Sequence, residues 1–254
     1  MIHACQVLRE RGRRVAILSR GYRADATGQN DEARVIAAHL PDVPHLQQPD
    51  RFAAGMTIAD RVDVFVLDDG FQHLPLARDA DVVLIDATDP FGGGLCAPAG
   101  RLREPIDALG RASLVILTRA DLVPREELGD SMRRIRAATA APIATAAFRP
   151  TCERPLEDHE VLVACGIGNP RAFVATVESM GARVAATRIF RDHHAYTESD
   201  AADLAASGLP VVVTEKDAVK LEPIWKAGAP LHVVRIRFEA LEGGEEIERL
   251  LDRL

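Results

Sequence analysis

The stretch VFVLDDGFQH, residues 64–73, decides how the fold of this chain can be interpreted. Four apolar residues lead into two aspartates, and a glycine, an amide and a histidine follow within four positions. Such an apolar run predicts a buried parallel strand, and open α/β sheets bind ligands at the carboxyl ends of their strands. Two adjacent carboxylates there indicate a Mg²⁺ ion beside a phosphorylated ligand. The alternative is a turn in which Asp68 and Asp69 only hydrogen-bond the local backbone before Gly70.

Strands and helices alternate on both sides of this stretch, which predicts an α/β fold with mostly parallel sheets. Residues 141–160 are irregular and contain prolines at 142, 150 and 155. We therefore place a boundary near Phe148, between a domain over residues 1–148 and a smaller α/β domain over residues 149–254. We expect helices over 2–11, 30–40, 106–113, 126–139, 170–181 and 198–208, and strands at 15–18, 62–69, 81–87, 113–121, 161–168, 183–190, 210–218 and 231–240.

Composition excludes several classes of function. The net charge of -7 argues against an extended nucleic-acid-binding face, which would be basic. The four cysteines lie far apart without a C-x-x-C pair, so we expect reduced thiols in a cytoplasmic protein. No apolar run reaches the roughly 18 residues of a membrane span, so any membrane contact is expected to be peripheral.

The first helix begins at the start of the sequence. No Ser, Thr, Asp or Asn precedes it to cap its free N–H groups. A helix that leads to a strand of a parallel sheet normally follows another strand. We therefore expect a first strand and a strand-to-helix turn to be missing from these 254 residues.

A long loop, DATDPFGGGLCAPAGRLREP (residues 86–105), combines three consecutive glycines with fixed charge at Arg101, Arg103 and Glu104. Two arginines at a pliant tip can close over an anionic substrate and bind its phosphate. The alternative is an ordinary loop with solvated arginines, although loops of this length are commonly functional.

Other charged residues have both structural and functional interpretations. Asp31 begins a helix, where an acidic first turn also complements the helix dipole. Arg20 and Tyr22 follow a strand, as a phosphate contact or as surface residues. Lys216, in VVVTEKDAVKL, lies after another strand, either as a phosphate-binding cation or in a capped helix with solvated lysines.

The segment IFRDHHAYTESD places Asp192, His193 and His194 in a row. Histidine titrates near neutral pH and can relay a proton or bind a metal. Adjacent side chains point in different directions on most backbones, so we expect only one of the two histidines to act. The D-H-H trio also occurs in two-metal phosphoesterases, which combine it with an early D-x-D pair.

Taken in order, these fragments resemble one family, the tetraacyldisaccharide 4'-kinases of lipid A biosynthesis. The matching segments are ILSRGYR, NDEA, FVLDDGFQHLPLARDADVVLIDA, FGGGLCAPAGRLREP, CGIGNPRAF, FRDHHAYT and VVVTEKDAVKL. The resemblance implies a P-loop-NTPase-like domain and a smaller α/β domain. It implies transfer of the ATP γ-phosphoryl group, with Mg²⁺, to the 4'-hydroxyl of an acylated glucosamine disaccharide 1-phosphate. It also implies peripheral attachment at the cytoplasmic face of the inner membrane.

The resemblance assigns roles to individual residues. Asp31 is implied as the general base, Asp68 as the Mg²⁺ ligand in the nucleotide site and Asp69 as a second active-site carboxylate. His194, in preference to His193, is implied as the partner of the base. Lys216 is implied as a cofactor contact. The implied substrate contacts are Arg20, Gln72, His73, Arg101, Arg103 and Glu104.

One element of the family pattern is not found. No G-x-x-x-x-G-K-[ST] motif occurs in the 254 residues, and alignment would put it before Met1. We expect Met1 to be an internal methionine, with an upstream strand and G-K-[ST] loop encoded in frame. Upstream stop codons with no such loop would contradict this. Because that loop cradles the phosphates, we expect impaired kinase activity from these residues alone. The alternatives are a non-catalytic remnant that binds the lipid disaccharide and a metal-dependent phosphoesterase.

Overall fold

The computed structural model describes residues 1–21, 30–226 and 228–254. Tyr22, one of the residues singled out in the sequence, lies outside this part of the chain. The chain divides into two compact units. Unit 1 comprises Met1–Arg20, Val43–Arg149 and Phe238–Leu254, and unit 2 comprises Gly21–Asp42 and Pro150–Arg237.

The main break, between Arg149 and Pro150, lies close to the boundary expected near Phe148. The division differs from the two uninterrupted segments 1–148 and 149–254 in two places. Gly21–Asp42 belongs to unit 2, and Phe238–Leu254 belongs to unit 1. Hydrophobic periodicity marks helices and strands but does not show which distant helix an element packs against.

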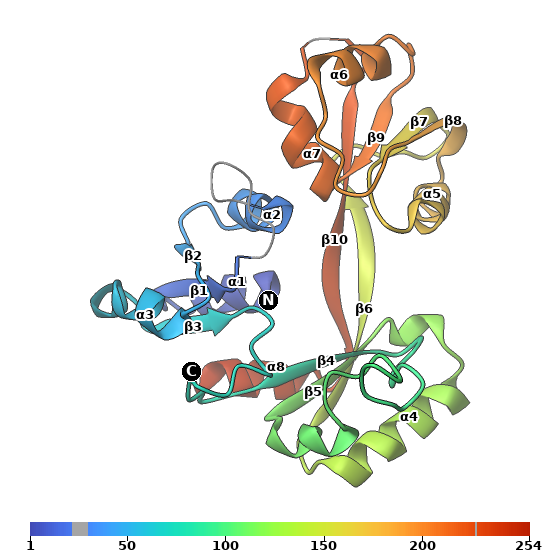
Figure 1. The fold of residues 1–254 in the computed structure, drawn as a ribbon. Coiled ribbons are helices and arrows are strands. Elements are labelled where there is room, and N and C mark those ends of the chain that lie inside the picture. The colour runs from blue at the N-terminus through green and yellow to red at the C-terminus, as the bar shows by residue number, and fades with distance from the viewer. Residues whose placement is uncertain (22–29, 227) are drawn as a thin grey trace. The chain divides into compact units, whose positions relative to one another are not determined.

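Helices and strands alternate as the sequence predicts. Unit 1 holds α1 (Ile2–Glu10), β1 (Val15–Ser19), β2 (His45–Gln47), α3 (Arg51–Met56), β3 (Val64–Leu67), β4 (Val82–Asp86), β5 (Leu114–Thr118), α4 (Arg125–Ala138) and α8 (Gly244–Asp252). Unit 2 holds α2 (Asp31–His39), β7 (Glu160–Cys165), α5 (Pro170–Ser179), β8 (Arg183–Ile189), α6 (Glu198–Ala205), β9 (Val211–Thr214) and α7 (Glu215–Leu221). Strands β6 (Ile143–Cys152) and β10 (Leu231–Glu242) contribute residues to both units (Figure 1).

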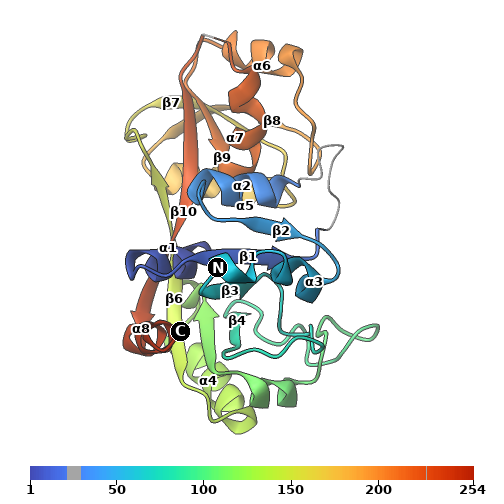
Figure 2. The ribbon, with the colours of Figure 1, turned by 90° about the vertical axis from the view of Figure 1, so that its left-hand side faces the viewer.

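Two sheets carry these strands, in the orders β2-β1-β3 and β4-β5-β6-β10-β9-β7-β8. Figure 2 shows β2, β1 and β3 side by side. The pairs β1–β2, β1–β3, β4–β5, β5–β6, β7–β8, β7–β9 and β9–β10 are all parallel. The predicted α/β class with mostly parallel sheets is confirmed.

The segment 106–113, predicted as an α-helix, contains a 3₁₀ helix over Ile106–Arg111 instead. Helix α3 was not predicted, because its six residues are too few to establish a helical period. Asp50 caps its N-terminus, and the Asp50 side chain accepts a hydrogen bond from the Ala53 N–H at 2.9 Å.

The core of unit 1 lies between β5 and its covering helices. Val115 and Leu117 are completely buried, and they pack in one cluster with Ile135 of α4. Helix α1 buries Cys5 and Leu8, as its periodicity predicts, and its cap residue Met1 makes no side-chain capping hydrogen bond.

Strands β3 and β4 are less buried than their apolar sequences predict. All four residues of β3 are half-buried, and on β4 Val82 and Leu84 are 41 % and 54 % exposed. Each strand is the edge of its sheet in the described part of the chain, so each has one neighbouring strand instead of two. The parallel strand predicted at residues 64–67 is therefore present, but it is half-buried and not buried as expected.

In unit 2, alternate residues of β7 face two helical layers (Figure 1). Val161 and Val163 pack with Phe173 and Val177 of α5. Leu162 and Ala164, which alternate with these valines along β7, pack with α6 and α7. This double coverage explains the uninterrupted apolar sequence of the strand. Among the described residues, no helix is long and apolar enough to cross a membrane.

Candidate active site

The carboxyl end of β3 turns sharply at the two aspartates of the opening stretch. The Asp68 N–H donates to the Leu18 carbonyl at 2.9 Å, which continues the pairing of β3 with β1. Asp69 has a φ of 50°, in the left-handed region. A Cβ placed on Gly70 would lie 2.7 Å from the Cβ of Leu67, so the turn requires glycine at this position.

The turn and the arginine loop meet within unit 1. Arg103 donates from Nη1 to both carboxylate oxygens of Asp69, at 2.7 and 2.6 Å. This hydrogen bond raises the pKa of Arg103. Beneath the turn, the 5 % exposed Arg51 donates to the Asp69 carbonyl at 3.2 Å. The structure therefore places two of the predicted residues, Asp69 and Arg103, in direct contact.

Asp68 lies at the carboxyl end of β3, next to the end of β1. Burial lowers the pKa of His45, and the nearby negative charge of Asp68 opposes that shift. The His45 ring is fixed by Ser19, whose hydroxyl lies 2.8 Å from Nε2. Within the described residues the Asp68 carboxylate makes no hydrogen bond or ion pair. No group of three His, Cys, Asp or Glu side chains able to hold a metal occurs in the described ranges. A nucleotide-bound Mg²⁺ commonly uses one or two carboxylates together with phosphates, so Asp68 fits that donor set.

The other residues predicted to contact substrate are spread over unit 1. Arg101 pairs with Asp89, and Glu104 accepts from Arg111 at 2.9 Å. Gln72 and His73 follow the aspartate turn, Gln72 exposed and His73 half-buried. Arg20 is exposed beyond the end of β1. Because Leu18 of β1 pairs with Leu67 of β3, Arg20 and the aspartate turn both follow the carboxyl ends of neighbouring parallel strands.

In unit 2, a second constellation is centred on Asp31, the first residue of α2. Asn30 begins that helix, with its side chain accepting from the Ala33 N–H at 2.8 Å. The Asp31 carboxylate is 18 % exposed, and its Oδ2 lies 3.0 Å from His193 Nδ1 and 3.3 Å from Lys220 Nζ. Lys220, on α7, is only 8 % exposed. Asp31 is therefore a partly buried carboxylate held on one oxygen by a histidine and a lysine.

The contacts of His193 define its tautomer. Its Nε2 lies 3.1 Å from Lys216 Nζ, which also lies 3.5 Å from Asp192. A protonated lysine can only donate, so Nε2 accepts and the ring proton is on Nδ1, directed at Asp31. The backbone of His193 has a φ of 60° and its N–H donates to the Gly166 carbonyl at 3.2 Å. The neutral ring thus links Lys216 to Asp31.

The family resemblance implied His194, in preference to His193, as the partner of Asp31. The structure places the His194 side chain against other residues. Its Nε2 is 3.1 Å from Asp200, and its ring stacks on Phe190 at 4.7 Å and meets Tyr196 edge-on. Adjacent side chains point apart, and the left-handed backbone at His193 turns that residue toward α2. The geometry therefore places His193, and not His194, on Asp31.

A buried aspartate supports this constellation. Asp217 on α7 is 0 % exposed and accepts from the Gly166 N–H at 3.0 Å, the Tyr196 hydroxyl at 2.9 Å and the Thr214 hydroxyl at 2.6 Å. Burial, together with the negative charge of Asp217, raises the pKa of Tyr196. Asp217 thus fixes the loop that carries His193.

The sequence analysis assigned no site role to Asp217, Lys220 or Tyr196. The available signal was the T-x-x-D spacing of Thr214 and Asp217 at a helix start. Thr214 does cap α7, as the structural interpretation of this segment predicts. The same interpretation predicts solvated lysines, and this part of it is wrong. The side chains of Lys216 and Lys220 are only 28 % and 8 % exposed.

Comparison with known proteins first defines the fold. The structure matches the crystal structure of the "apo" form of LpxK from Aquifex aeolicus in complex with ATP, with a TM-score of 0.79 and 24 % identity. The match covers 99 % of this chain and 82 % of that one. The chain therefore shares the α/β fold of that structure.

The sequence comparisons define the family. The family model described as tetraacyldisaccharide-1-P 4'-kinase matches residues 1–254. A tetraacyldisaccharide 4'-kinase of Anaeromyxobacter dehalogenans strain 2CP-1 is 42 % identical, over 95 % of this chain and 73 % of its own length. One from Geobacter metallireducens is 36 % identical, over 86 % of this chain and 72 % of its own length. This chain belongs to the tetraacyldisaccharide-1-P 4'-kinase family.

Proposed function

We propose that this chain takes part in lipid A biosynthesis by transferring the γ-phosphoryl group of ATP to the 4'-hydroxyl of a tetraacylated glucosamine disaccharide 1-phosphate. Family membership supports the reaction class and the acceptor. The observation that carries the proposal is the carboxylate of Asp31, held by His193 and Lys220 on a single oxygen. Kinases use such a carboxylate to orient the attacking hydroxyl and accept its proton.

Asp31 is arranged for this role. Its Oδ2 receives both contacts, whereas Oδ1 has no hydrogen bond within the described residues. Oδ1 can therefore accept the hydroxyl proton of the substrate. The proton moves from the sugar oxygen to this carboxylate as that oxygen bonds to the γ-phosphorus of ATP, the bond from this phosphorus to the β,γ-bridging oxygen breaks, and ADP leaves with the bonding electron pair. His193 and Lys220 fix the carboxylate, which lowers the entropic cost of alignment.

The remaining predicted residues follow from family resemblance and from the contacts within each unit. Asp68 would hold Mg²⁺, which neutralises phosphate charge during transfer. Lys216 would contact the nucleotide phosphates. Asp69, held by Arg103, would act beside Asp68. The proposed substrate contacts are Arg20, Gln72, His73, Arg101, Arg103 and Glu104.

The proposed site of action is the cytoplasmic face of the inner membrane, where the acylated substrate resides. The acyl chains of this substrate would keep the enzyme peripherally associated while it acts. A flotation assay with lipid vesicles tests this: co-migration with vesicles that contain the disaccharide supports peripheral binding, and recovery only in the aqueous fraction contradicts it.

The 254 residues contain no G-K-[ST] loop to hold the β- and γ-phosphates. Backbone N–H groups and a lysine in that loop supply much of the charge stabilisation in P-loop enzymes. We therefore propose that these residues by themselves transfer phosphate slowly. Loss of one preorganised donor alone costs about 10²–10³-fold in rate, and the loop supplies several.

A pair of proteins tests the function. The first is the 254-residue chain, and the second is a chimera in which a strand and a G-K-[ST] loop of the kind found in P-loop enzymes are joined before Met1. Both are incubated with radiolabelled ATP, Mg²⁺ and the lipid disaccharide, and the product is analysed for the position of its phosphate. We expect 4'-phosphorylation by the chimera and at least 100-fold less by the chain alone, on the scale of the donor loss above.

Each arm can fail separately. Equal rates for the two proteins would contradict the impairment. A chimera that binds the disaccharide without phosphorylating it would favour the binding-remnant alternative. Phosphate on a different hydroxyl or a different acceptor would refute the proposed function.

A further inference from the structure

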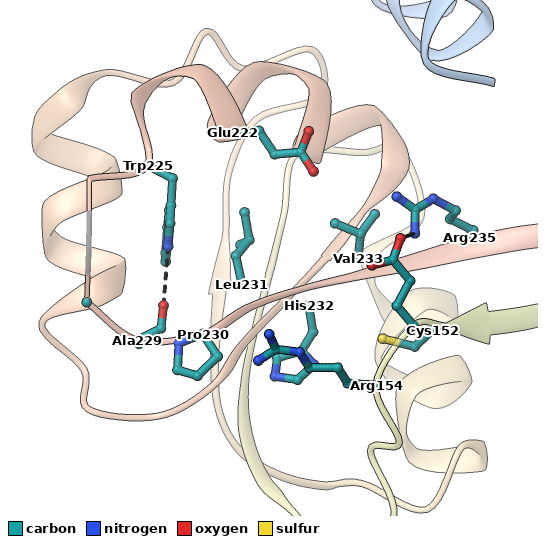
Figure 3. Close-up of a pocket in the computed structure, with 12 residues that line it drawn as sticks. Cys152, Arg154, Glu222, Trp225, Ala229, Pro230, Leu231, His232, Val233 and Arg235 are labelled. Atoms are coloured by element: carbon teal, nitrogen blue, oxygen red, sulfur yellow. Dashed lines mark hydrogen bonds and ion pairs between the residues drawn. The ribbon is translucent and has the colours of Figure 1, made fainter. Parts of the chain in front are cut away.

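A cavity of about 350 Å³ in unit 2 involves none of the residues assigned to phosphoryl transfer. It lies among the end of β6, the start of β10 and the side chains of Glu222 and Trp225 (Figure 3). Its polar lining includes Arg154, His232 and Glu222, and its apolar lining includes Trp225 and Leu231. This volume is within the range of small-molecule sites.

His232 is the feature that distinguishes this cavity from an ordinary surface hollow. The residue is 9 % exposed, and its Nδ1 is buried without a hydrogen-bond partner among the described residues. Burial, with smaller contributions from Arg154 and His159, lowers the pKa of the imidazole. Buried polar atoms are nearly always hydrogen-bonded, so the unpartnered Nδ1 of this cavity-lining residue points to a group supplied from outside the chain, a bound water or a ligand.

Charge is distributed unevenly over the lining. Arg235 is neutralised by Glu153 at 2.7 Å. Arg154 makes no hydrogen bond or ion pair with any residue that the structure describes. Figure 3 shows Arg154 beside His232 at one end of the cavity and Glu222 at the other. An anionic group is therefore favoured at the first end, and a hydrogen-bond donor at the second.

An apolar wall connects the two ends. The Trp225 indole is fixed by its Nε1, which donates to the Ala229 carbonyl at 3.2 Å. In Figure 3 the ring is seen nearly edge-on, with one face turned toward Leu231. A flat face of this kind stacks well on a planar ring.

We propose that this cavity binds a small planar organic anion. The ring lies against Trp225, the anionic group contacts Arg154 and His232, and an N–H donor of the ligand faces Glu222. The inference rests on the cavity alone, so it stands or fails independently of the proposed kinase function.

The sequence provides a direct reporter, since Trp225 is the one tryptophan in the chain. Its indole N–H gives a single side-chain resonance in a ¹H–¹⁵N correlation spectrum. The 254-residue chain is titrated separately with guanosine 5'-monophosphate and with 4-aminobenzoate, which each combine a planar ring, an anionic group and N–H donors. Guanosine and inorganic phosphate are the matched controls without the anion and without the ring.

We expect saturable shifts of the indole resonance with at least one of the two probes, and at least tenfold weaker binding by Arg154→Gln. Arg171→Gln, at an exposed position of α5 away from the cavity, should bind like the parent chain. Absence of a saturable shift with either probe up to about 5 mM, well past a millimolar dissociation constant, overturns the proposal. Equal binding by Arg154→Gln and Arg171→Gln also overturns it, as does equal binding of the probes and their controls.

Discussion

Asp217 offers a sharp test of how unit 2 is held together, because its carboxylate is completely buried and accepts hydrogen bonds from three separate elements. The donors are the Gly166 backbone, the Tyr196 hydroxyl and the Thr214 hydroxyl, at 3.0, 2.9 and 2.6 Å. Lys220 lies 4.0 Å away. Asp217→Ala removes the acceptor and leaves the donors buried without it.

The magnitude follows from these contacts. A hydrogen bond to a charged group contributes about 1.5–3 kcal/mol, and three that share one acceptor are not additive. Breaking a buried charged network by removing one partner typically costs about 3–5 kcal/mol. We expect a loss in this range in the free energy of unfolding, equivalent to a fall of roughly 6–20 °C in Tm for a chain of this size.

Urea denaturation followed by Trp225 fluorescence measures this change, because Trp225 belongs to the same unit as Asp217. Asp203→Ala is the matched control. Asp203 is exposed on α6, so its replacement should alter stability by no more than about 0.5 kcal/mol. If Asp217→Ala unfolds at the same urea concentration as this control, the assigned role of the buried carboxylate is refuted.

Three further predictions follow from other contacts. In the active chimera, His193→Gln should lower kcat at least tenfold, on the scale of general-base support. His194→Gln should leave kcat within a few fold; the reverse order in steady-state assays would contradict the pairing with Asp31. Gly70→Ala should cost about 1–3 kcal/mol in urea unfolding, because its Cβ would lie 2.7 Å from a neighbouring Cβ; unchanged stability would show a looser turn. Hydrogen bonds from the Thr197 N–H and hydroxyl lower the pKa of Asp200, and His194 makes a smaller contribution in the same direction. Their stabilisation is present above the unfolded-state pKa, near 4, and lost as pH falls through the lower folded value. Asp200→Asn should remove that part of the acid dependence of Tm below about pH 4, and an unchanged acid limb would contradict it.

Local sequence patterns were sufficient for the fold class and for several contacts. The alternation of apolar runs with helical periods identified the parallel strands, and adjacency along the chain identified the aspartate turn at residues 68–70. The pairing of Asp69 with Arg103 joins two loops that were both singled out from sequence. Polar and charged residues at strand ends could be recognised because parallel strands bring such ends to one edge.

The rest depended on tertiary structure. No pattern in the D-H-H trio distinguishes His193 from His194, because the backbone angle that separates them is set by contacts of Gly166 and Asp217. The ion pair of Lys220 could not be predicted, because its partner Asp31 lies 189 positions away in sequence. From sequence, Lys220 was therefore interpreted as solvated. The exposure of β4 was also not predictable, since its apolar sequence is the same whether one neighbouring strand is present or two.

The most direct test of the central claim is the rate of 4'-phosphorylation by the chimera with and without the Asp31 carboxylate. Asp31→Asn keeps the shape of the side chain and removes its ability to take the hydroxyl proton. We expect kcat to fall by about 10²–10⁴-fold, with Asp203→Asn close to the parent rate and the folded far-ultraviolet spectrum retained by both variants. Turnover by Asp31→Asn within a few fold of the parent chimera would contradict the assignment of Asp31 as the base.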